Sequence, residues 1–190
     1  LLVVVPSFGL KSIRQSTPGS GATNTLTVSL TADFDLPAGS TVTITGLTGS
    51  QTGSPTGQSS VTVTSTEELL GTSGAWTQTP GQLVLTVASG GTVSGTPCVV
   101  TFALTNNATA QVSPAVSVSA EIKNQSVSVG SIASAAMTKP GTALYGVANG
   151  ADPLTVVVPS FAVKSIGQST PASGATNTLT VSLTADFDLP

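Results

Sequence analysis

The sequence predicts an all-β protein whose strands pack as an antiparallel sandwich, and three observations support this prediction. Apolar residues alternate with Thr and Ser through several short runs, which is the period of a strand with one buried face. Turn signals that contain Gly and Pro separate these runs. Residues 1–37 occur again, nearly unchanged, as residues 154–190, so we expect the sandwich to be repeated in tandem.

The clearest predicted strand begins at Leu26. Its apolar residues occupy every second position, and they are Leu26, Val28, Leu30, Ala32, Phe34 and Leu36. The hydroxyl side chains of the residues between them take the other face. The same alternation predicts strands within residues 40–46, 60–65, 82–88, 98–106, 115–122 and 126–132. Turn signals lie between them at 37–39, 49–58, 79–81, 89–91, 106–107 and 139–141. Only residues 65–71 and residues 133–137 are candidates for a helical turn, so we expect almost no helix.

The two copies of the repeated segment align without a gap. They differ only at the pairs Leu2/Thr155, Gly9/Ala162, Leu10/Val163, Arg14/Gly167 and Gly19/Ala172. The offset of about 153 residues far exceeds the ~20–50 residues of solenoid repeats, so the repeating unit is a domain. We therefore interpret residues 1–153 as one full repeat and residues 154–190 as the start of the next.

The boundary between the repeats leaves two alternatives open. Residues 147–153 resemble a linker, and the apolar run 154–158 follows directly. This run is either the first strand of its own repeat or a strand added to the sheet of the preceding repeat. We favour strand sharing because the linker is too short for two independent neighbours, and residues 1–8 would then be shared with a preceding repeat in the same way.

Composition narrows the class of protein. Charged residues make up 7% of the chain, against about 25% in an ordinary soluble domain, while Ser and Thr make up about 30%. Such a hydroxyl-rich surface is typical of secreted proteins that carry sugars. The net charge of −3 argues against nucleic acid as a partner, because no basic stripe can form. The longest apolar run is far shorter than the ~20 residues of a membrane helix, so we expect no membrane span in this segment.

Long strings of the chain resemble the repeats of very long extracellular proteins of algae and other aquatic microbes. The most specific parts are LPAGSTVTITGLTGS, AWTQTPGQLVLTV and FALTNNATAQ. The resemblance covers most of the chain. It implies a surface or filament protein made of concatenated immunoglobulin-like sandwiches, often heavily glycosylated, and it implies no known activity.

Candidate modification sites lie between the predicted strands. Asn107 and Asn124 each begin an Asn-x-Ser/Thr sequon, and both are expected in exposed loops. Hydroxyls near Pro are candidates for O-linked sugars, and these are Ser16, Thr17, Thr52, Ser54 and Thr56. The alternative is that these segments are plain flexible loops.

Metal and catalytic chemistry find little support in the sequence. Asp33, Asp35 and Asp152 are the candidates for Ca²⁺, but a calcium site needs six or more oxygens and these carboxylates are too few. The chain contains no His, which excludes a Ser-His-Asp or Cys-His arrangement. We therefore expect no cofactor, no metal and no enzymatic activity.

Single residues and the Thr rows have ordinary explanations. Cys98 has inward parity and is interpreted as a buried free thiol, with interchain bonding as the alternative. Trp76 is expected to pack in the core rather than to stack on a sugar. The Thr-x-Thr rows in residues 23–27, 41–45 and 62–64 have the spacing of ice-binding faces, but Thr is simply a common exposed strand residue.

These observations favour a structural function. Our first hypothesis is a structural repeat of an extracellular, glycosylated filament or cell-surface fibre, whose partners are neighbouring repeats or identical subunits. The second is the stalk of a long adhesin. The third, a carbohydrate- or ice-binding module, lacks a recognisable constellation of residues.

Overall fold

The protein was analysed as a computed structural model that describes residues 5–55 and 57–188. It confirms the all-β class, because the described residues form eleven strands and no α-helix. The strands are β1 (Phe8–Gln15), β2 (Thr23–Ala32), β3 (Thr41–Thr45), β4 (Ser59–Ser65), β5 (Ser73–Thr77), β6 (Gln82–Thr86), β7 (Cys98–Thr105), β8 (Ser117–Asn124), β9 (Val127–Ala136), β10 (Phe161–Gln168) and β11 (Leu179–Ala185). A single 3₁₀ turn at Thr66–Glu68 confirms the helical turn expected within residues 65–71.

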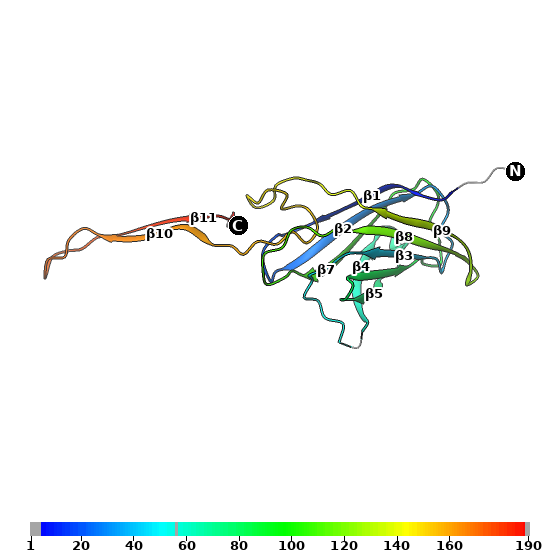
Figure 1. Cartoon of the computed structure of the whole chain (residues 1–190), viewed down its shortest axis with the longest axis horizontal. Helices are drawn as coiled ribbons and strands as arrows, with labels where there is room; N and C mark the ends of the chain where they lie inside the picture. The colour runs from blue at the N-terminus through cyan, green and yellow to red at the C-terminus, as the bar shows by residue number, and fades with distance from the viewer. Residues whose placement is uncertain (1–4, 56, 189–190) are drawn as a thin grey trace.

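Nine strands form one antiparallel sheet in the order β1-β2-β7-β4-β5-β6-β3-β8-β9. The sheet curves into a nearly closed barrel (Figure 1). Its two edges meet where Thr138, just after β9, lies beside β1. The amide of Ile13 donates to the carbonyl of Thr138 at 3.0 Å, and the amide of Thr138 donates to the carbonyl of Lys11 at 2.8 Å. These bonds satisfy backbone groups that an open sheet edge would leave exposed.

The core follows from the alternation of side chains. Along β2 the burial pattern alternates strictly, so that Leu26, Val28 and Leu30 face inward and the hydroxyl residues face outward. Strand β7 repeats this pattern beside it, with Cys98 buried as a free thiol, as expected. Burial raises the pKa of this thiol, because an apolar environment disfavours the thiolate.

Two details of the expected pattern are wrong. Phe34 continues the inward parity of β2 in the sequence, but the strand ends at Ala32 and the chain bends, so the Phe34 ring is 41% exposed. Residues 133–137, a candidate helical turn, belong mostly to the edge strand β9. This segment is extended because it pairs with β8, and that pairing outweighs the local preference of its alanines.

Strand β5 was not expected from the sequence, and it carries Trp76. The indole is fully buried, as the core interpretation requires, and its Nε1–H donates to the carbonyl of Thr52 at 2.8 Å. This bond satisfies the one polar atom of the side chain. Gly74 precedes it in β5 because a Cβ there would lie 2.7 Å from the side chain of Leu83.

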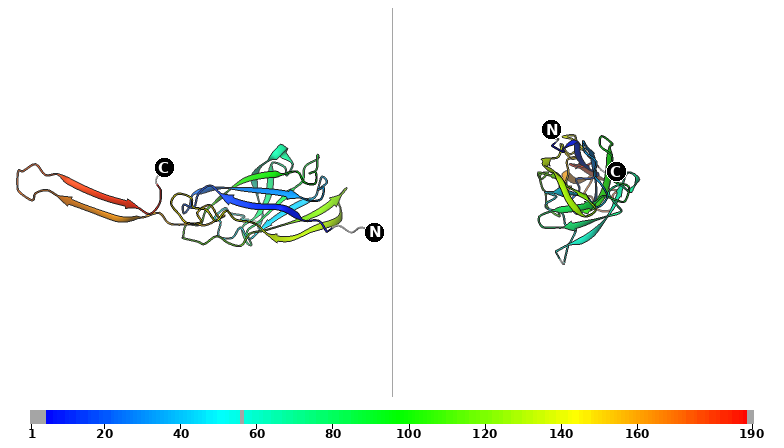
Figure 2. Two further views of the ribbon diagram at one scale, coloured as in Figure 1. Left: turned by 90° about the horizontal axis from the view of Figure 1, so that it is seen from above. Right: turned by 90° about the vertical axis from the view of Figure 1, so that its right-hand side faces the viewer.

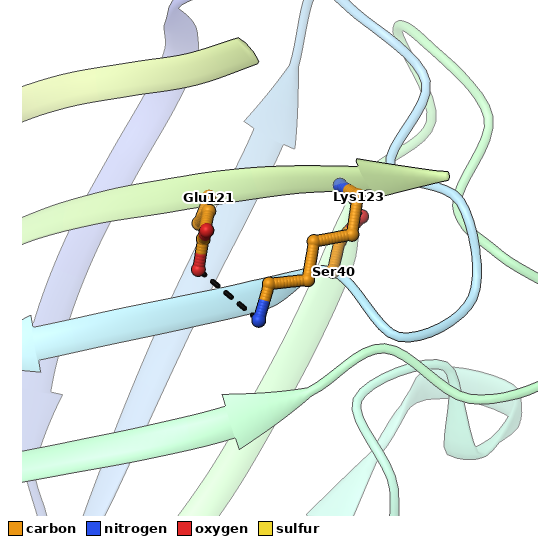
Figure 3. Close-up of polar contacts among 3 residues, drawn as sticks. All are labelled: Ser40, Glu121 and Lys123. Atoms are coloured by element: carbon orange, nitrogen blue, oxygen red, sulfur yellow. Dashed lines mark hydrogen bonds and ion pairs between the residues drawn. The ribbon is translucent and has the colours of Figure 1, made fainter. Parts of the chain in front are cut away.

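The start of β3 is held to the end of β8 by a small polar contact (Figure 3). The fully buried hydroxyl of Ser40 accepts a hydrogen bond from the amide of Lys123 at 3.0 Å. The ammonium of Lys123 lies 3.1 Å from the carboxylate of Glu121, and this is the one ion pair found among the described residues. Because both side chains are partly exposed, the pair contributes little to stability.

Strands β10 and β11 form a separate hairpin that extends from the end of the barrel opposite the start of β1 (Figures 1 and 2). Its register repeats that of β1 and β2 residue by residue, including the irregularity between Phe161 and Val163 that matches the one between Phe8 and Leu10. The two hairpins differ in burial. Leu179, Val181 and Leu183 are 56–60% exposed, whereas their equivalents in β2 are buried.

This duplication provides a matched test of core packing. We predict that Leu26→Ala lowers the free energy of unfolding of the barrel by about 2–5 kcal/mol, because it leaves a cavity in a packed core. The equivalent change Leu179→Ala is expected to alter it by less than about 0.5 kcal/mol. Urea unfolding followed by the fluorescence of Trp76, the only Trp in the chain, measures both. Equal losses in the two variants would contradict the description of β10–β11 as uncovered.

Candidate functional site at the end of the barrel

The start of the second copy packs into the end of the barrel. We refer to residues 154–157 as the junction segment. Leu154 is fully buried and Val156 is 2% exposed. Val156 exchanges two backbone hydrogen bonds of 2.8 Å with Gln111, as in an antiparallel strand pair. On the other side, the amide of Val157 donates to the carbonyl of Pro18 at 2.8 Å, and the amide of Ser20 donates to that of Val157 at 2.9 Å. The junction segment therefore fills a gap between two loops of the barrel.

The side chain of Gln111 strengthens this attachment. Its Nε2 donates to the carbonyl of Leu154 at 3.1 Å and to that of Thr48 at 3.0 Å, while its Oε1 accepts from Asn107 at 3.2 Å. The amide group lies so close to Gly49 that a Cβ there would overlap it. Gly49 also has a positive φ of 85°, which favours Gly for a second reason.

Three side-chain amides form a buried cluster behind the junction segment. We refer to Gln15, Asn24 and Asn106 as the amide cluster; Asn24 and Asn106 are fully buried, and Gln15 is 5% exposed. Asn24 Nδ2 donates to Gln15 Oε1 at 2.7 Å and to Asn106 Oδ1 at 2.8 Å. No buried side-chain nitrogen or oxygen among the described residues lacks a partner, so the cluster is fully satisfied.

The amide cluster holds backbone as well as its own members. Gln15 Nε2 donates to the carbonyls of Gly150 at 2.7 Å and Thr155 at 2.9 Å, and so reaches the junction segment itself. Asn106 Nδ2 donates to the carbonyls of Thr17 at 3.0 Å and Gly19 at 2.8 Å. A polar network of this kind fixes positions through direction as well as distance.

The sequence analysis did not identify this cluster. One signal was present, because Asn24 has the inward parity of Leu26 and Val28 and so places an amide where the pattern predicts an apolar residue. In the second copy, Asn177 Nδ2 donates to Gln168 Oε1 at 2.9 Å, but both residues are exposed. The local pair therefore forms in both hairpins, and only the first has an Asn106 beside it.

The two sequons lie in different surroundings. Asn124 is exposed at the end of β8, where Gln125 and Ser126 form the tight turn to β9 with φ of 48° and 70°. Asn107 is half-buried in the loop after β7, and its Nδ2 already donates to Gln111. Asn124 is therefore the more accessible acceptor for a sugar.

The hydroxyl candidates lie in hydrogen-bonded loops. The hydroxyl of Ser16 accepts from the amide of Thr25 at 2.9 Å, and that of Thr17 accepts from the amide of Gly19 at 3.1 Å. The hydroxyl of Thr52 accepts from the amide of Thr105 at 2.7 Å, and that of Ser54 accepts from the amide of Gln78 at 2.9 Å. The fifth candidate, Thr56, lies outside the described residues. The four described hydroxyls therefore shape their loops, which is typical of Ser and Thr in turns.

The three candidate calcium carboxylates serve separate loops. Asp33 accepts from the amide and the hydroxyl of Ser7, both at 2.6 Å, whereas Asp35 and Asp152 each accept from a single amide at 2.7 Å. No group of three potential metal ligands occurs among the described residues. Each carboxylate therefore accepts from a segment that lies 11 to 59 residues away in the sequence, and the three do not meet at one site.

One groove, of about 250 Å³, lies between the β1–β2 hairpin and residues 138–140. Its lining includes the hydroxyls of Ser12, Thr27 and Ser29 together with Arg14 and Lys139, and it contains no carboxylate. The ammonium of Lys139 donates to the carbonyl of Ser113 at 3.2 Å. No helix in the described parts of the chain is long and apolar enough to cross a membrane.

The Thr rows do not share one face. The sheet order separates β2 from β4 by β7, and β3 lies three places beyond β4. The rows at 23–27, 41–45 and 62–64 are therefore spread around a curved sheet, whereas an ice-binding face requires a flat array.

Comparison with protein-family models and with curated proteins gives no match. Among solved structures, the chain is similar to one described as "AvmM Catalyzes Macrocyclization in Alchivemycin A Biosynthesis". The match covers 72% of this chain and 92% of that chain, with 11% sequence identity and a TM-score of 0.37. A TM-score below 0.5 carries no argument about this protein.

The amide cluster leads to a second matched prediction. We expect Asn24→Ala to destabilise the barrel by about 1–3 kcal/mol, because it leaves buried partners of Asn24 without hydrogen bonds. The equivalent change Asn177→Ala removes an exposed amide and is expected to cost less than about 0.5 kcal/mol. Urea unfolding measures the difference. If Asn24→Ala had the same free energy of unfolding as the parent, the amide cluster would not contribute to the stability of the barrel.

A third prediction concerns the carboxyl of Asp33. Hydrogen bonds from the hydroxyl and then the amide of Ser7 hold the pKa of Asp33 below its ordinary value, and Ser160 does the same for Asp186. Such a group stabilises the fold above its ordinary pKa of about 3.9, and this contribution is lost as the pH falls through the lower folded pKa.

Ser7→Ala is therefore expected to raise the pKa of Asp33 only part of the way to its ordinary value, because the hydrogen bond from the backbone amide of residue 7 remains. NMR titration of the carboxyl carbons measures this, with the unaltered Asp186 as the control in the same sample. An unchanged pKa of Asp33 would show that the hydroxyl is not responsible.

Proposed function

We propose that this chain is a structural repeat of an extracellular, glycosylated filament or cell-surface fibre, in which barrels follow one another and share strands. The observation that carries the proposal is the position of the junction segment. Residues 154–157 begin the second copy in sequence, yet they are buried in the barrel of the first. Each barrel in such an array is completed by the first residues of its successor.

Strand sharing supplies mechanical continuity. A simple linker transmits tension through one covalent chain and leaves the neighbours free to swivel. Here the crossing chain also forms four backbone bonds through Val156, Val157 and their partners, and two side-chain bonds from Gln15 and Gln111. The equivalent residues 1–4 lie outside the described residues.

The β10–β11 hairpin fits the same arrangement. Five of its apolar residues are of the same type as the equivalent buried residues of the first hairpin. They are Phe161, Ile166, Leu179, Val181 and Leu183, which correspond to Phe8, Ile13, Leu26, Val28 and Leu30. Residues 38–153 cover these side chains in the first hairpin. In the array, an equivalent stretch covers the second hairpin. Without that cover, the hairpin is an apolar surface of a kind that soluble proteins rarely leave open.

The finer architecture is part of the proposal. The first half of β4 pairs with β5 and its second half pairs with β7, so β4 belongs to both parts of the curved sheet. Strands that pass between two packed sheets in this way occur at the corners of sandwiches. We therefore interpret the barrel as an immunoglobulin-like sandwich whose two sheets are joined through β4.

The extracellular location rests on composition and on the exposed sequon. A surface with 7% charged residues needs another source of solubility, and a sugar on Asn124 at the β8–β9 turn would supply it. A sugar there would also shield the edge strand β9. The proposed partners are copies of the same barrel, and the proposal needs no cofactor.

Hydrogen exchange tests the attachment of the junction segment. We expect Val156→Asp to expose the amides of Gln111 and Ser20, because a buried carboxylate expels the segment from its gap. Val158→Asp is the matched control, since Val158 is two residues further on and 53% exposed. If Val156→Asp left both amides as protected as in the parent, strand sharing would be wrong.

Images of the native assembly test the function itself. Uniform thin fibres of evenly spaced beads are expected of a filament. A rod that ends in a distinct head would instead indicate the stalk of an adhesin. Compact, unconnected particles would contradict both.

A further inference from the structure

The aromatic ring of Phe34 lies partly exposed at the end of the barrel where β1 begins. Phe34 is 41% exposed, and Val5, at the same end, is 79% exposed. In the second copy the equivalent of Phe34 is Phe187. That ring stacks on Tyr145 with ring centroids 5.3 Å apart and planes at 12°. The same side chain is therefore exposed in one copy and paired in the other.

The contact around Phe187 also involves backbone. The amide of Asp188 donates to the carbonyl of Tyr145 at 3.1 Å. Tyr145 belongs to a tight turn in which Leu144 and Val147 exchange backbone bonds of 3.1 and 3.0 Å. The next residue is Gly146 with φ 75°, and a Cβ there would lie 3.1 Å from Asp188 Oδ1. The turn is thus shaped to receive residues 187–188.

The two Phe residues occupy the same place on their own hairpins. The hydroxyl of Ser160 donates to the carboxylate of Asp186 at 2.6 Å, and the hydroxyl of Ser7 donates to that of Asp33 at the same distance. In each pair the amide of the Asp donates to the carbonyl of the Ser at 3.0 Å. These bonds fix the bend between the hairpin and the ring that follows. Phe34 and Phe187 therefore follow the same hydrogen-bonded bend on nearly identical hairpins.

We propose that Phe34 is the docking point for the Tyr145 turn of another copy of this barrel, and that this stacking fixes the angle between neighbours. The inference rests on the proposed array, because it requires a second barrel before the first. It adds a second point of attachment to the junction. The chain leaves the barrel through the junction segment and returns to it at residues 187–188, so two contacts restrict a rotation that a single crossing would allow.

The exposed apolar end of the barrel thus has one occupant, a second copy that presents its residues 144–147. The charge at the contact agrees with this, because the residues that meet are neutral apart from Asp188. Stacking of Tyr on Phe also suits a partly wet surface, since the phenol can keep its hydroxyl in water.

The 190-residue chain itself provides the test. Spin labels are attached through Val129→Cys on β9 and Ser173→Cys in the β10–β11 turn, with Cys98→Ala to remove the native thiol. We expect Phe187→Ala and Tyr145→Ala to broaden the distribution of label-to-label distances at least twofold. Phe34→Ala is the matched control, because it makes the same change where no Tyr145 turn is present, and it should leave the width unchanged. A width unaffected by both Phe187→Ala and Tyr145→Ala would overturn the proposal.

A second measurement extends the test to two barrels. In a chain that carries residues 1–153 twice before the final hairpin, Phe34→Ala in the second copy should broaden the distances between labels on the two barrels. The same change in the first copy should not. Equal effects in the two copies would contradict the docking role of Phe34.

Amide exchange separates this inference from the proposed function. Protected amides at Val156 and Val157 together with an unchanged distance distribution would refute only the aromatic contact. Unprotected amides at both positions in the parent chain would refute strand sharing itself.

Discussion

The barrel depends on the burial of one apolar face of the β1–β2 hairpin. Strand β2 lies between β1 and β7, and its inward side chains reach the centre of the core. The second hairpin has nearly the same sequence, the same register and the same local hydrogen bonds, but its apolar face is open. The conformation of the hairpin is therefore set locally, while its stability comes from the surface that covers it.

The amide cluster and Gln111, at the end of the barrel that holds the junction segment, have a different role. An apolar contact tolerates sliding, whereas an incoming segment must be held at a fixed register if it is to continue the chain in a defined direction. Gln15, Asn106 and Gln111 provide amide donors that meet backbone carbonyls at fixed positions, and Asn24 connects two of them. Because amides carry no charge, burying them requires only complete hydrogen bonding, which the described residues achieve.

The sequence predicts those parts of the fold whose pattern is local. Strands β2 and β7 alternate strictly, so they were predicted from their own residues. Strand β1 was missed because only Phe8, Ile13 and Gln15 are buried and an irregularity near Leu10 breaks the alternation. Strand β5 is short and contains Gly74, and β9 was partly misread because an exposed edge strand lacks an apolar period.

The candidate site was less predictable than the fold. Its members come from positions as far apart as Gln15, Asn106 and Thr155, and only the folded chain brings them together. In the sequence, Asn24 is marked only by its inward parity in the alternation of β2. The exposure of Phe34 likewise depends on a bend fixed by the distant pair Ser7 and Asp33, which no periodicity reveals.

The pairing of β2 with β7 has a consequence for synthesis. Leu30 of β2 lies opposite Cys98 of β7 in the sheet. Because these two strands are far apart in the sequence, the first hairpin leaves the ribosome well before the strand that pairs with it. This chain contains two nearly identical hairpins that β7 could pair with, β1–β2 and β10–β11. Because β1–β2 and β7 both precede β10–β11 in the chain, synthesis from the N-terminus favours the pairing of β7 with the first hairpin.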